Sequence, residues 1–152
     1  MNLRKNEKGF TLVELIIVLA VIAIILGVVI PAIQGMQEEA NLTRAEQEIA
    51  TLETAIMSFF RHSGGFPTNI TTDLTGASPR IVEFVLADPF ATDNSNNTYG
   101  YVTGNDAEFG DYYIVYTQGP DRTPATSWND TNNQVDSTGD DLAISNAFVN
   151  KN

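Results

Sequence analysis

Acidic side chains gather in the C-terminal third of the chain, in a stretch with few apolar residues. Five aspartates lie in this stretch: Asp121, Asp130, Asp136, Asp140 and Asp141. Clustered carboxylates repel one another, and calcium relieves the repulsion because it binds about six to eight oxygen ligands. The stretch is not an EF-hand loop, which needs a glycine at its sixth position and a glutamate at its twelfth. The spacing therefore leaves two interpretations open, a calcium site or solvated loop acids.

Glu14 is unusual because it lies among apolar residues. It directly precedes Leu15 to Ile30, a run of 16 residues without a polar side chain. A carboxylate inside a membrane-spanning helix costs roughly 2.5–3.5 kcal/mol on insertion scales. We therefore expect Glu14 to pair with a cation, and an amine is the cation that we favour. The alternative is a tolerated charge at the membrane interface.

The apolar residues around Glu14 predict a membrane span over residues 10–33. The stretch is longer than the h-region of a secretory signal peptide, which has about 7–15 apolar residues. Arg4, Lys5 and Lys8 precede it and acidic residues follow it. By the positive-inside rule, the N-terminus lies in the cytoplasm and everything after about Gln34 lies outside.

The next segment shows helical periodicity. Apolar residues recur at spacings of three and four at Leu42, Ala45, Ile49, Leu52, Ile56 and Phe59. This pattern predicts an amphipathic helix. Together with the span it predicts a single helix from Phe10 to about Arg61, which Gly64, Gly65 and Pro67 bring to an end. We expect the apolar stripe to pack under a β-hairpin and not to form a coiled coil.

The remaining residues predict a small β-rich head. Residues 69–77 are expected to form a loop, and Ser78-Pro79 is expected to start a short helix through Leu86. The stretches 99–102 and 112–117 are rich in aromatic and β-branched residues, which indicates an antiparallel hairpin. Residues 119–141 predict a long loop, and residues 142–144 a last short strand. The predicted fold class is α+β, with a long helix packed on a small antiparallel sheet.

Composition limits the classes of function. The chain has 152 residues, with 8 Lys+Arg against 19 Asp+Glu, a formal net charge of −11 and no cysteine. The negative charge disfavours nucleic acid as a partner, and the lack of cysteine excludes disulfides and thiol catalysis. The single histidine, His62, lies at the predicted helix end. No nucleophile elbow, phosphate loop or histidine metal pair is present, so we expect no enzymatic activity.

The string Lys8-Gly9-Phe10-Thr11-Leu12-Val13-Glu14, placed directly before the apolar run, resembles the leader of type IV pilin-like proteins. This family includes pilins and the pseudopilins of type II secretion. The resemblance implies that a prepilin peptidase cuts after Gly9 and that Phe10 becomes the N-methylated terminus. It also implies that Glu14 guides assembly and that Pro31 bends the helix. The new amine of Phe10 would then pair with Glu14 of a neighbouring subunit.

The resemblance implies three segments. Residues 1–9 would be the leader peptide, residues 10–33 the transmembrane and polymerisation half of the helix, and residues 34–152 the head. The order of Asp88-Pro89-Phe90, the hairpin and the acidic stretch is most similar to the major pseudopilins, whose C-terminal aspartates hold calcium. This similarity implies calcium in the present chain as well. The candidate ligands are Asp121, Asp136, Asp140 and Asp141.

The implied function is a structural subunit of a helical filament built from identical copies, most similar to the shaft of the type II secretion pseudopilus. The implied partners are the prepilin peptidase, minor pilins or pseudopilins and an inner-membrane assembly platform. The chain would be a single-pass protein of the bacterial cytoplasmic membrane, with its head outside the cytoplasm and its filament in the cell envelope. Two alternatives stay open. One is a pilin of a surface pilus used for adhesion, twitching or DNA uptake, and the other is a binding or enzymatic domain on a simple anchor.

Overall fold

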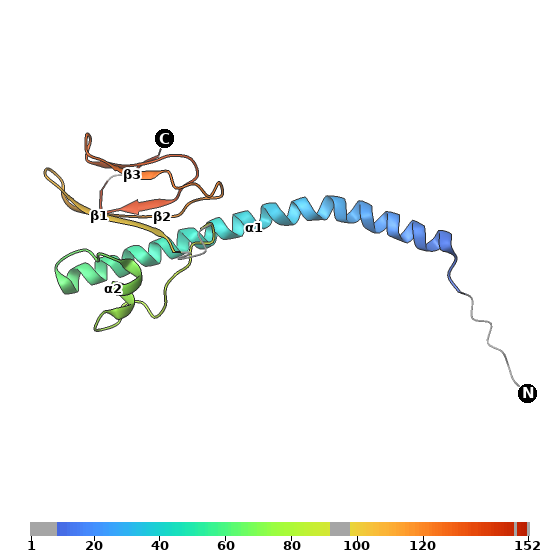
Figure 1. Cartoon of the computed structure of the whole chain (residues 1–152), viewed down its shortest axis with the longest axis horizontal. Coiled ribbons are helices and arrows are strands. Elements are labelled where there is room, and N and C mark those ends of the chain that lie inside the picture. Colours follow the sequence, from blue (N-terminus) through green and yellow to red (C-terminus); the bar gives the residue numbers. More distant parts are fainter. Residues whose placement is uncertain (1–8, 92–97, 148, 152) are drawn as a thin grey trace, which may run out of the picture. The chain divides into compact units, whose positions relative to one another are not determined.

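The computed structural model describes residues 9–91, 98–147 and 149–151. The chain divides into two units, with the boundary between Glu38 and Glu39. Helix α1, Leu12–Ser63, passes through both units, and Figure 1 shows it without a break. This confirms the predicted single long helix. At its end Gly64 has a φ of +80° and donates its N–H to the Phe60 carbonyl at 2.8 Å, which is the expected glycine cap.

The start of α1 lies two residues after the predicted start at Phe10, because Thr11 caps the helix. The Thr11 hydroxyl accepts the Glu14 N–H at 3.2 Å, and the Glu14 carboxylate accepts the Thr11 N–H at 2.8 Å. This reciprocal pair is a capping box, and it satisfies two of the unpaired N–H groups at a helix start. The pattern Thr-x-x-Glu in the sequence is the signal from which the true boundary follows.

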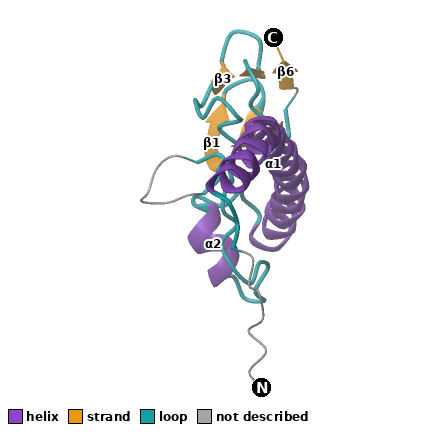
Figure 2. Cartoon of the chain, turned by 90° about the vertical axis from the view of Figure 1, so that its right-hand side faces the viewer, coloured by secondary structure: helices purple, strands orange, loops and turns teal. Residues whose placement is uncertain are grey.

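The second unit contains α1 from Glu39 onward, helix α2 (Ile70–Gly76) and two three-stranded sheets, which Figure 2 shows in orange. The first sheet has the order β1-β2-β5, formed by Gly100–Asp106, Gly110–Tyr116 and Ala143–Ser145. All of its pairs are antiparallel, which confirms the predicted hairpin and the strand near residue 143. The second sheet has the order β3-β4-β6, formed by Thr126–Asn129, Gln134–Ser137 and Val149–Lys151. Strand β6 runs parallel to β4.

The core of the second unit lies between α1 and the first sheet. The apolar stripe of α1 is buried at Ala45, Ile49, Leu52 and Ile56. Tyr113 and Val115 of β2 belong to the same hydrophobic cluster. These contacts confirm that the stripe packs under the hairpin, as expected of an amphipathic helix on a sheet.

The prediction for residues 69–86 is wrong, because the short helix α2 lies at 70–76 and residues 78–86 form no helix. The Asn69 side chain accepts the N–H groups of Thr71 at 2.9 Å and Thr72 at 3.2 Å, so Asn69 is the N-cap. Ile70 and Leu74, one helical turn apart, are both buried. An asparagine cap with an apolar pair outweighs the Ser78-Pro79 signal.

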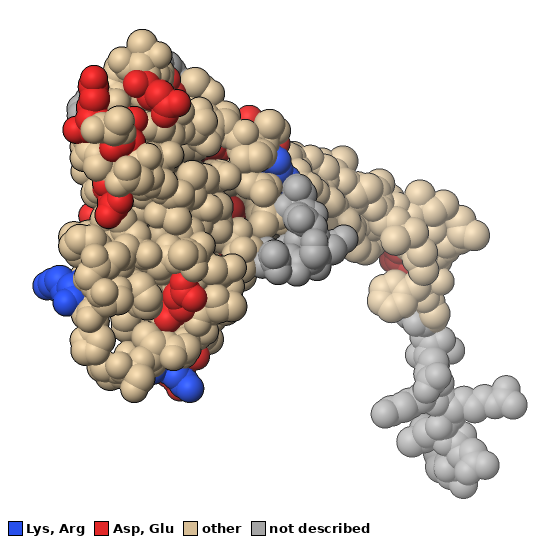
Figure 3. Space-filling view, turned by 60° about the vertical axis from the view of Figure 1, so that its left-hand side comes forward, with Lys and Arg blue, Asp and Glu red and all other residues tan. Residues whose placement is uncertain are grey.

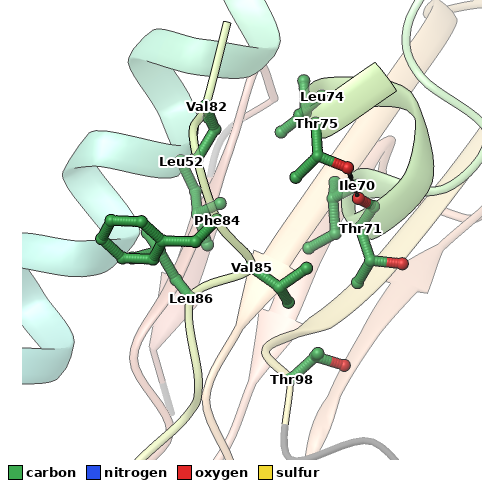
Figure 4. Close-up of a pocket in the computed structure, with 10 residues that line it drawn as sticks. All are labelled: Leu52, Ile70, Thr71, Leu74, Thr75, Val82, Phe84, Val85, Leu86 and Thr98. Atoms are coloured by element: carbon green, nitrogen blue, oxygen red, sulfur yellow. Dashed lines mark hydrogen bonds between the residues drawn. The ribbon is translucent and has the colours of Figure 1, made fainter. Parts of the chain in front are cut away.

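Segment 82–86 instead lies as an extended chain beside α1 and α2. In Figure 4, Leu52 of α1 and Leu74 and Ile70 of α2 face Val82 and Val85 across a small hollow. The hollow has a volume of about 10 Å³, which is room for about one water molecule. Phe84 in the same segment is 65% exposed.

The prediction of a structureless loop over residues 119–141 is also wrong, because β3 and β4 pair antiparallel within it. Their side chains make contacts that no local period reveals. Trp128 of β3 stacks on Tyr112 of β2, with ring centroids 4.0 Å apart and planes 9° apart. Val135 of β4 is fully buried. Long-range contacts thus stabilise a short hairpin in a polar sequence.

Candidate functional site

Three aspartates form a cluster in the second unit. One carboxylate oxygen from each of Asp121, Asp140 and Asp141 lies within 4.8 Å of the other two. Asp141 is 4% exposed, whereas Asp121 lies at the surface. Three of the four predicted ligands therefore meet, although 19 residues separate Asp121 from Asp140 in the chain.

Part of the oxygen set of the cluster is used by protein donors. The Asp141 Oδ2 atom accepts the Ala125 N–H at 2.7 Å and the Thr126 hydroxyl at 2.9 Å. The Asp140 Oδ2 atom accepts the Asp121 N–H at 3.0 Å. These bonds hold the three carboxylates in position and leave the second oxygen of Asp140 and of Asp141 for another partner.

Those second oxygens indicate a missing cation. Asp140 Oδ1 and Asp141 Oδ1 are buried and have no hydrogen-bond partner within the described part of the chain. An unpaired buried carboxylate oxygen is costly, and such groups usually pair or coordinate a metal. The ion pair that the described residues form, Arg44 with Glu48, lies on α1. Oxygen donors of this kind suit a hard cation such as calcium, so the residues fit the predicted metal.

The electrostatics of Asp141 agree with a cation site. Burial is the main cause that raises the pKa of Asp141 above its ordinary value, and the neighbouring charges of Asp121 and Asp140 raise it further. The hydrogen bonds from Ala125 and Thr126 act in the opposite direction and do not cancel the rise. The charged form of Asp141 is therefore disfavoured as long as no cation is bound.

The structure does not bring Asp136, the fourth predicted ligand, into the cluster. Its carboxylate accepts the Asn129 side-chain N–H at 2.6 Å, across the β3–β4 pair. Asp136 alternates along β4 with the buried Val135 and Ser137, so it faces away from the side on which those residues are buried. Strand alternation was not predicted for this segment, which is why Asp136 was included.

Gly119 is required at the edge of the cluster. Its φ is +66°, and a Cβ atom on this residue would lie 2.6 Å from Asp140 Oδ1 and 2.8 Å from the Asp140 carbonyl oxygen. A side chain at position 119 would therefore both strain the backbone and displace Asp140. The close approach allows the segment before Asp121 to pass directly over Asp140.

The second candidate site is the exposed apolar surface of the first unit. Every described residue from 9 to 40 is exposed, including Ile24 at 71% and Val28 at 70%. Between Gly9 and Gln37 only Glu14 carries a charge, and Figure 3 shows a nearly uncharged surface there. On the visible face of the second unit the same view shows mainly acidic groups. Helix α1 is long and apolar enough to cross a membrane.

Gly9, Phe10 and Glu14 lie together at the start of this surface. Gly9 and Phe10 precede the helix, and Phe10 is 91% exposed. The Thr11 N–H and hydroxyl both bond to Glu14 Oε2, at 2.8 and 2.9 Å. Pro31 lies inside α1. Thr11 was not among the predicted site residues, although its capping pattern with Glu14 is visible in the sequence.

Comparison with known proteins agrees with this arrangement. Residues 4–30 match the prokaryotic N-terminal methylation motif. The chain is 26% identical over 143 residues to type II secretion system core protein G of Escherichia coli, an alignment that covers 87% of this chain and 94% of the relative. Core protein G of Pectobacterium carotovorum is 25% identical, with 82% of this chain and 86% of the relative covered.

Fimbrial proteins match over a shorter part. The fimbrial protein EcpB of Eikenella corrodens is 40% identical over 63 residues, and the chain spans only 39% of that relative. No solved structure matches the chain significantly.

The chain is thus a type IV pilin-like protein, with the methylation motif, the long N-terminal helix and the α+β head of that family. Within the family, the relatives that align along most of their length are core proteins G of type II secretion systems. The relatives are named as structural proteins and not as enzymes.

Proposed function

We propose that this protein is the major pseudopilin of a type II secretion system, a subunit whose copies form the shaft of the pseudopilus. The observation that carries the proposal is the alignment with core protein G over 94% of that relative, leader and head included. The exposed apolar half of α1 supports it. In the membrane, lipid covers this surface, and in a filament identical helices would cover it.

Burial of this surface supplies the driving force for assembly. Burying a Leu, Ile or Val side chain stabilises by about 1.5–3 kcal/mol, and residues 12–33 carry many such side chains. A filament core of parallel helices leaves Glu14 as the charge in an apolar layer. The amine of Phe10 in a neighbouring subunit, freed by cleavage, is the partner that we propose for it.

We propose three segments for the chain: leader 1–9, polymerisation half 10–33 and head 34–152. The leader would be removed by a prepilin peptidase, and minor pseudopilins and an inner-membrane platform would act in assembly. The mature chain would lie in the bacterial cytoplasmic membrane with its head outside the cytoplasm, and its filament would lie in the envelope. Loss of the leader removes three of the 8 basic and one of the 19 acidic side chains, which changes the formal charge from −11 to −13.

The cleavage step has a direct test. Mass spectrometry of the protein from membranes is expected to show an N-terminus at Phe10 that carries an added methyl group. A Gly9→Val variant is expected to keep all nine leader residues, because a side chain would occupy the place of glycine before the cleaved bond. Wild-type protein that still begins at Met1 and stays monomeric outside detergent would contradict the proposal and favour a simple anchor.

We further propose calcium as the cation of the acidic cluster, held by Asp121, Asp140 and Asp141. The orphaned oxygens of Asp140 and Asp141 support this role. Calcium would neutralise the carboxylates and hold the segments that carry them together. It would also reduce repulsion between the acidic heads of neighbouring subunits.

The second candidate function is a pilin of a surface pilus. The higher identity to EcpB favours it, but that alignment covers only 41% of this chain. Electron microscopy of fibres sheared from cells, with identification of their protein, separates the two functions. Fibres of this protein recovered at wild-type expression would favour the pilus, and their absence from the sheared fraction, with filaments in the envelope, would favour the pseudopilus.

A further inference from the structure

Asp88 is a buried carboxylate that the proposed function has not used. It is 4% exposed and follows the extended segment 82–86. Its Oδ1 atom accepts the Phe90 N–H at 2.9 Å and the Thr117 hydroxyl at 2.7 Å. Its Oδ2 atom accepts the Gln118 N–H at 3.1 Å. Asp88 thus binds the chain directly after β2 at two successive residues.

Thr117 connects Asp88 to both segments that carry the acidic cluster. It is fully buried, and its hydroxyl, while donating to Asp88, accepts the Gly119 N–H at 3.3 Å. Its own N–H donates to the Leu142 carbonyl at 3.0 Å. Gly119 begins the segment that leads to Asp121, and Leu142 directly follows Asp141. One side chain therefore fixes the two strands of chain on which all three acids lie.

The tolerance for movement between these two segments is small. Gly119 has no room for a Cβ atom beside Asp140, and the Asp121 N–H bonds to the carboxylate of Asp140. A shift of residue 119 therefore changes the spacing of the carboxylate oxygens. Metal affinity depends on such spacing, because residues behind the ligands hold them in the binding geometry.

We propose that Asp88 and Thr117 are positioning residues that set the calcium affinity of the Asp121, Asp140 and Asp141 cluster without touching the ion. The proposal rests on the calcium role proposed above. Thr117 places Gly119 relative to Leu142, and the buried carboxylate of Asp88 fixes the orientation of the Thr117 hydroxyl. The two residues act in series, so loss of either interrupts the same connection.

The test uses the full chain in detergent micelles, titrated with calcium chloride in a calorimeter. Thr117→Val keeps the size of the side chain and removes the hydroxyl, and we expect it to raise the calcium Kd about tenfold or more. Thr117→Ser keeps the hydroxyl and is expected to stay within about threefold of wild type. Asp88→Asn is expected to raise the Kd as well, because its amide group would face the Gln118 N–H. The double variant should be little worse than Thr117→Val alone, as for two residues in one connection.

A packing control separates positioning from general stability. Leu74→Ala removes a buried side chain of α2, a change of the kind that lowers stability by about 2–5 kcal/mol. It is expected to lower the melting temperature in chelator and to leave the calcium Kd unchanged. Terbium luminescence, sensitised by the aromatic residues of the head, gives a second measure of affinity for any variant too weak for calorimetry.

Each outcome decides the proposal. A wild-type Kd in Thr117→Val, or an equal rise in Thr117→Val and Leu74→Ala, would overturn the positioning role while calcium binding by the wild type stands. If the wild type binds neither calcium nor terbium, the calcium role itself fails and the positioning role fails with it. A rise in Thr117→Val and Asp88→Asn alone supports the proposal.

Discussion

A Glu14→Ala variant is expected to enter the membrane as well as wild type and to form no filaments. Membrane insertion should not suffer, because removing a carboxylate from a spanning helix removes a cost of roughly 2.5–3.5 kcal/mol. Assembly should fail, because the amine of Phe10 would then be buried among apolar helices without its partner. The measurement is the amount of sheared or envelope filament relative to the amount of membrane-bound subunit.

Glu14 also caps its own helix, so the charge and the cap must be separated. Glu14→Gln serves as the control, because glutamine at this position can still accept the Thr11 N–H in a capping box. If pairing with the amine drives assembly, Glu14→Gln fails as completely as Glu14→Ala. Filaments from Glu14→Gln in wild-type amounts would refute the charge-pairing account and leave the cap as the role of Glu14.

Calcium is expected to stabilise the head strongly, and Asp141→Asn is expected to reverse that response. At a free concentration of about 100 times Kd, calcium adds about 2.7 kcal/mol of stability, which raises the melting temperature by about 10 °C for a head of this size. Asp141→Asn keeps an oxygen for the Ala125 N–H and removes a ligand charge. We expect it to lose most of the calcium response. The measurement is thermal melting of both proteins in calcium and in chelator.

The pH dependence gives the same prediction a sharper form. Burial raises the pKa of Asp141 above 3.8, so the protonated form stabilises the fold fully below that pH. This contribution is lost as pH rises through the raised pKa. In chelator, Asp141→Asn should therefore become more stable than wild type at neutral pH and match it near pH 3.8. With calcium the order at neutral pH should reverse.

The comparison must be made as a difference between the two proteins. Hydrogen bonds from backbone groups lower the pKa of Asp73 and of Asp106, and these groups add stability as pH rises. Their effect is the same in wild type and in Asp141→Asn, so it cancels. Parallel curves for the two proteins in chelator, with equal melting temperatures in calcium, would show that Asp141 takes no part in cation binding.

Local pattern was enough to predict the helical part of the molecule. The apolar run, the basic residues before it and the stripe from Leu42 to Phe59 are read along the chain. A helix satisfies its own backbone hydrogen bonds locally, so its periodicity predicts it without knowledge of the rest. The leader motif is also contiguous. The hairpin of β1 and β2 was predictable for the same reason, since its strands follow one another across a short turn.

Other elements were decided only by contacts between distant residues. Strands β3 and β4 look like loop in the sequence, and packing of Trp128 on Tyr112 is part of what holds them. Asp136 was a sound candidate by composition and is directed elsewhere by strand alternation. The short helix lies at 70–76 because Ile70 and Leu74 are buried there, which the capping signal at Ser78 did not reveal.

The sequence alone was sufficient to show a charged leader, a single apolar helix with one acid in it, and a surplus of carboxylates near the C-terminus. Only the folded chain showed which carboxylates meet, that two of their oxygens are buried without partners, and that Asp88 and Thr117 stand behind them. The physical reason is distance along the chain. Periodicity records which face of a segment is apolar, whereas a cation site depends on loop closure and hydrogen bonds between segments that the local pattern does not relate.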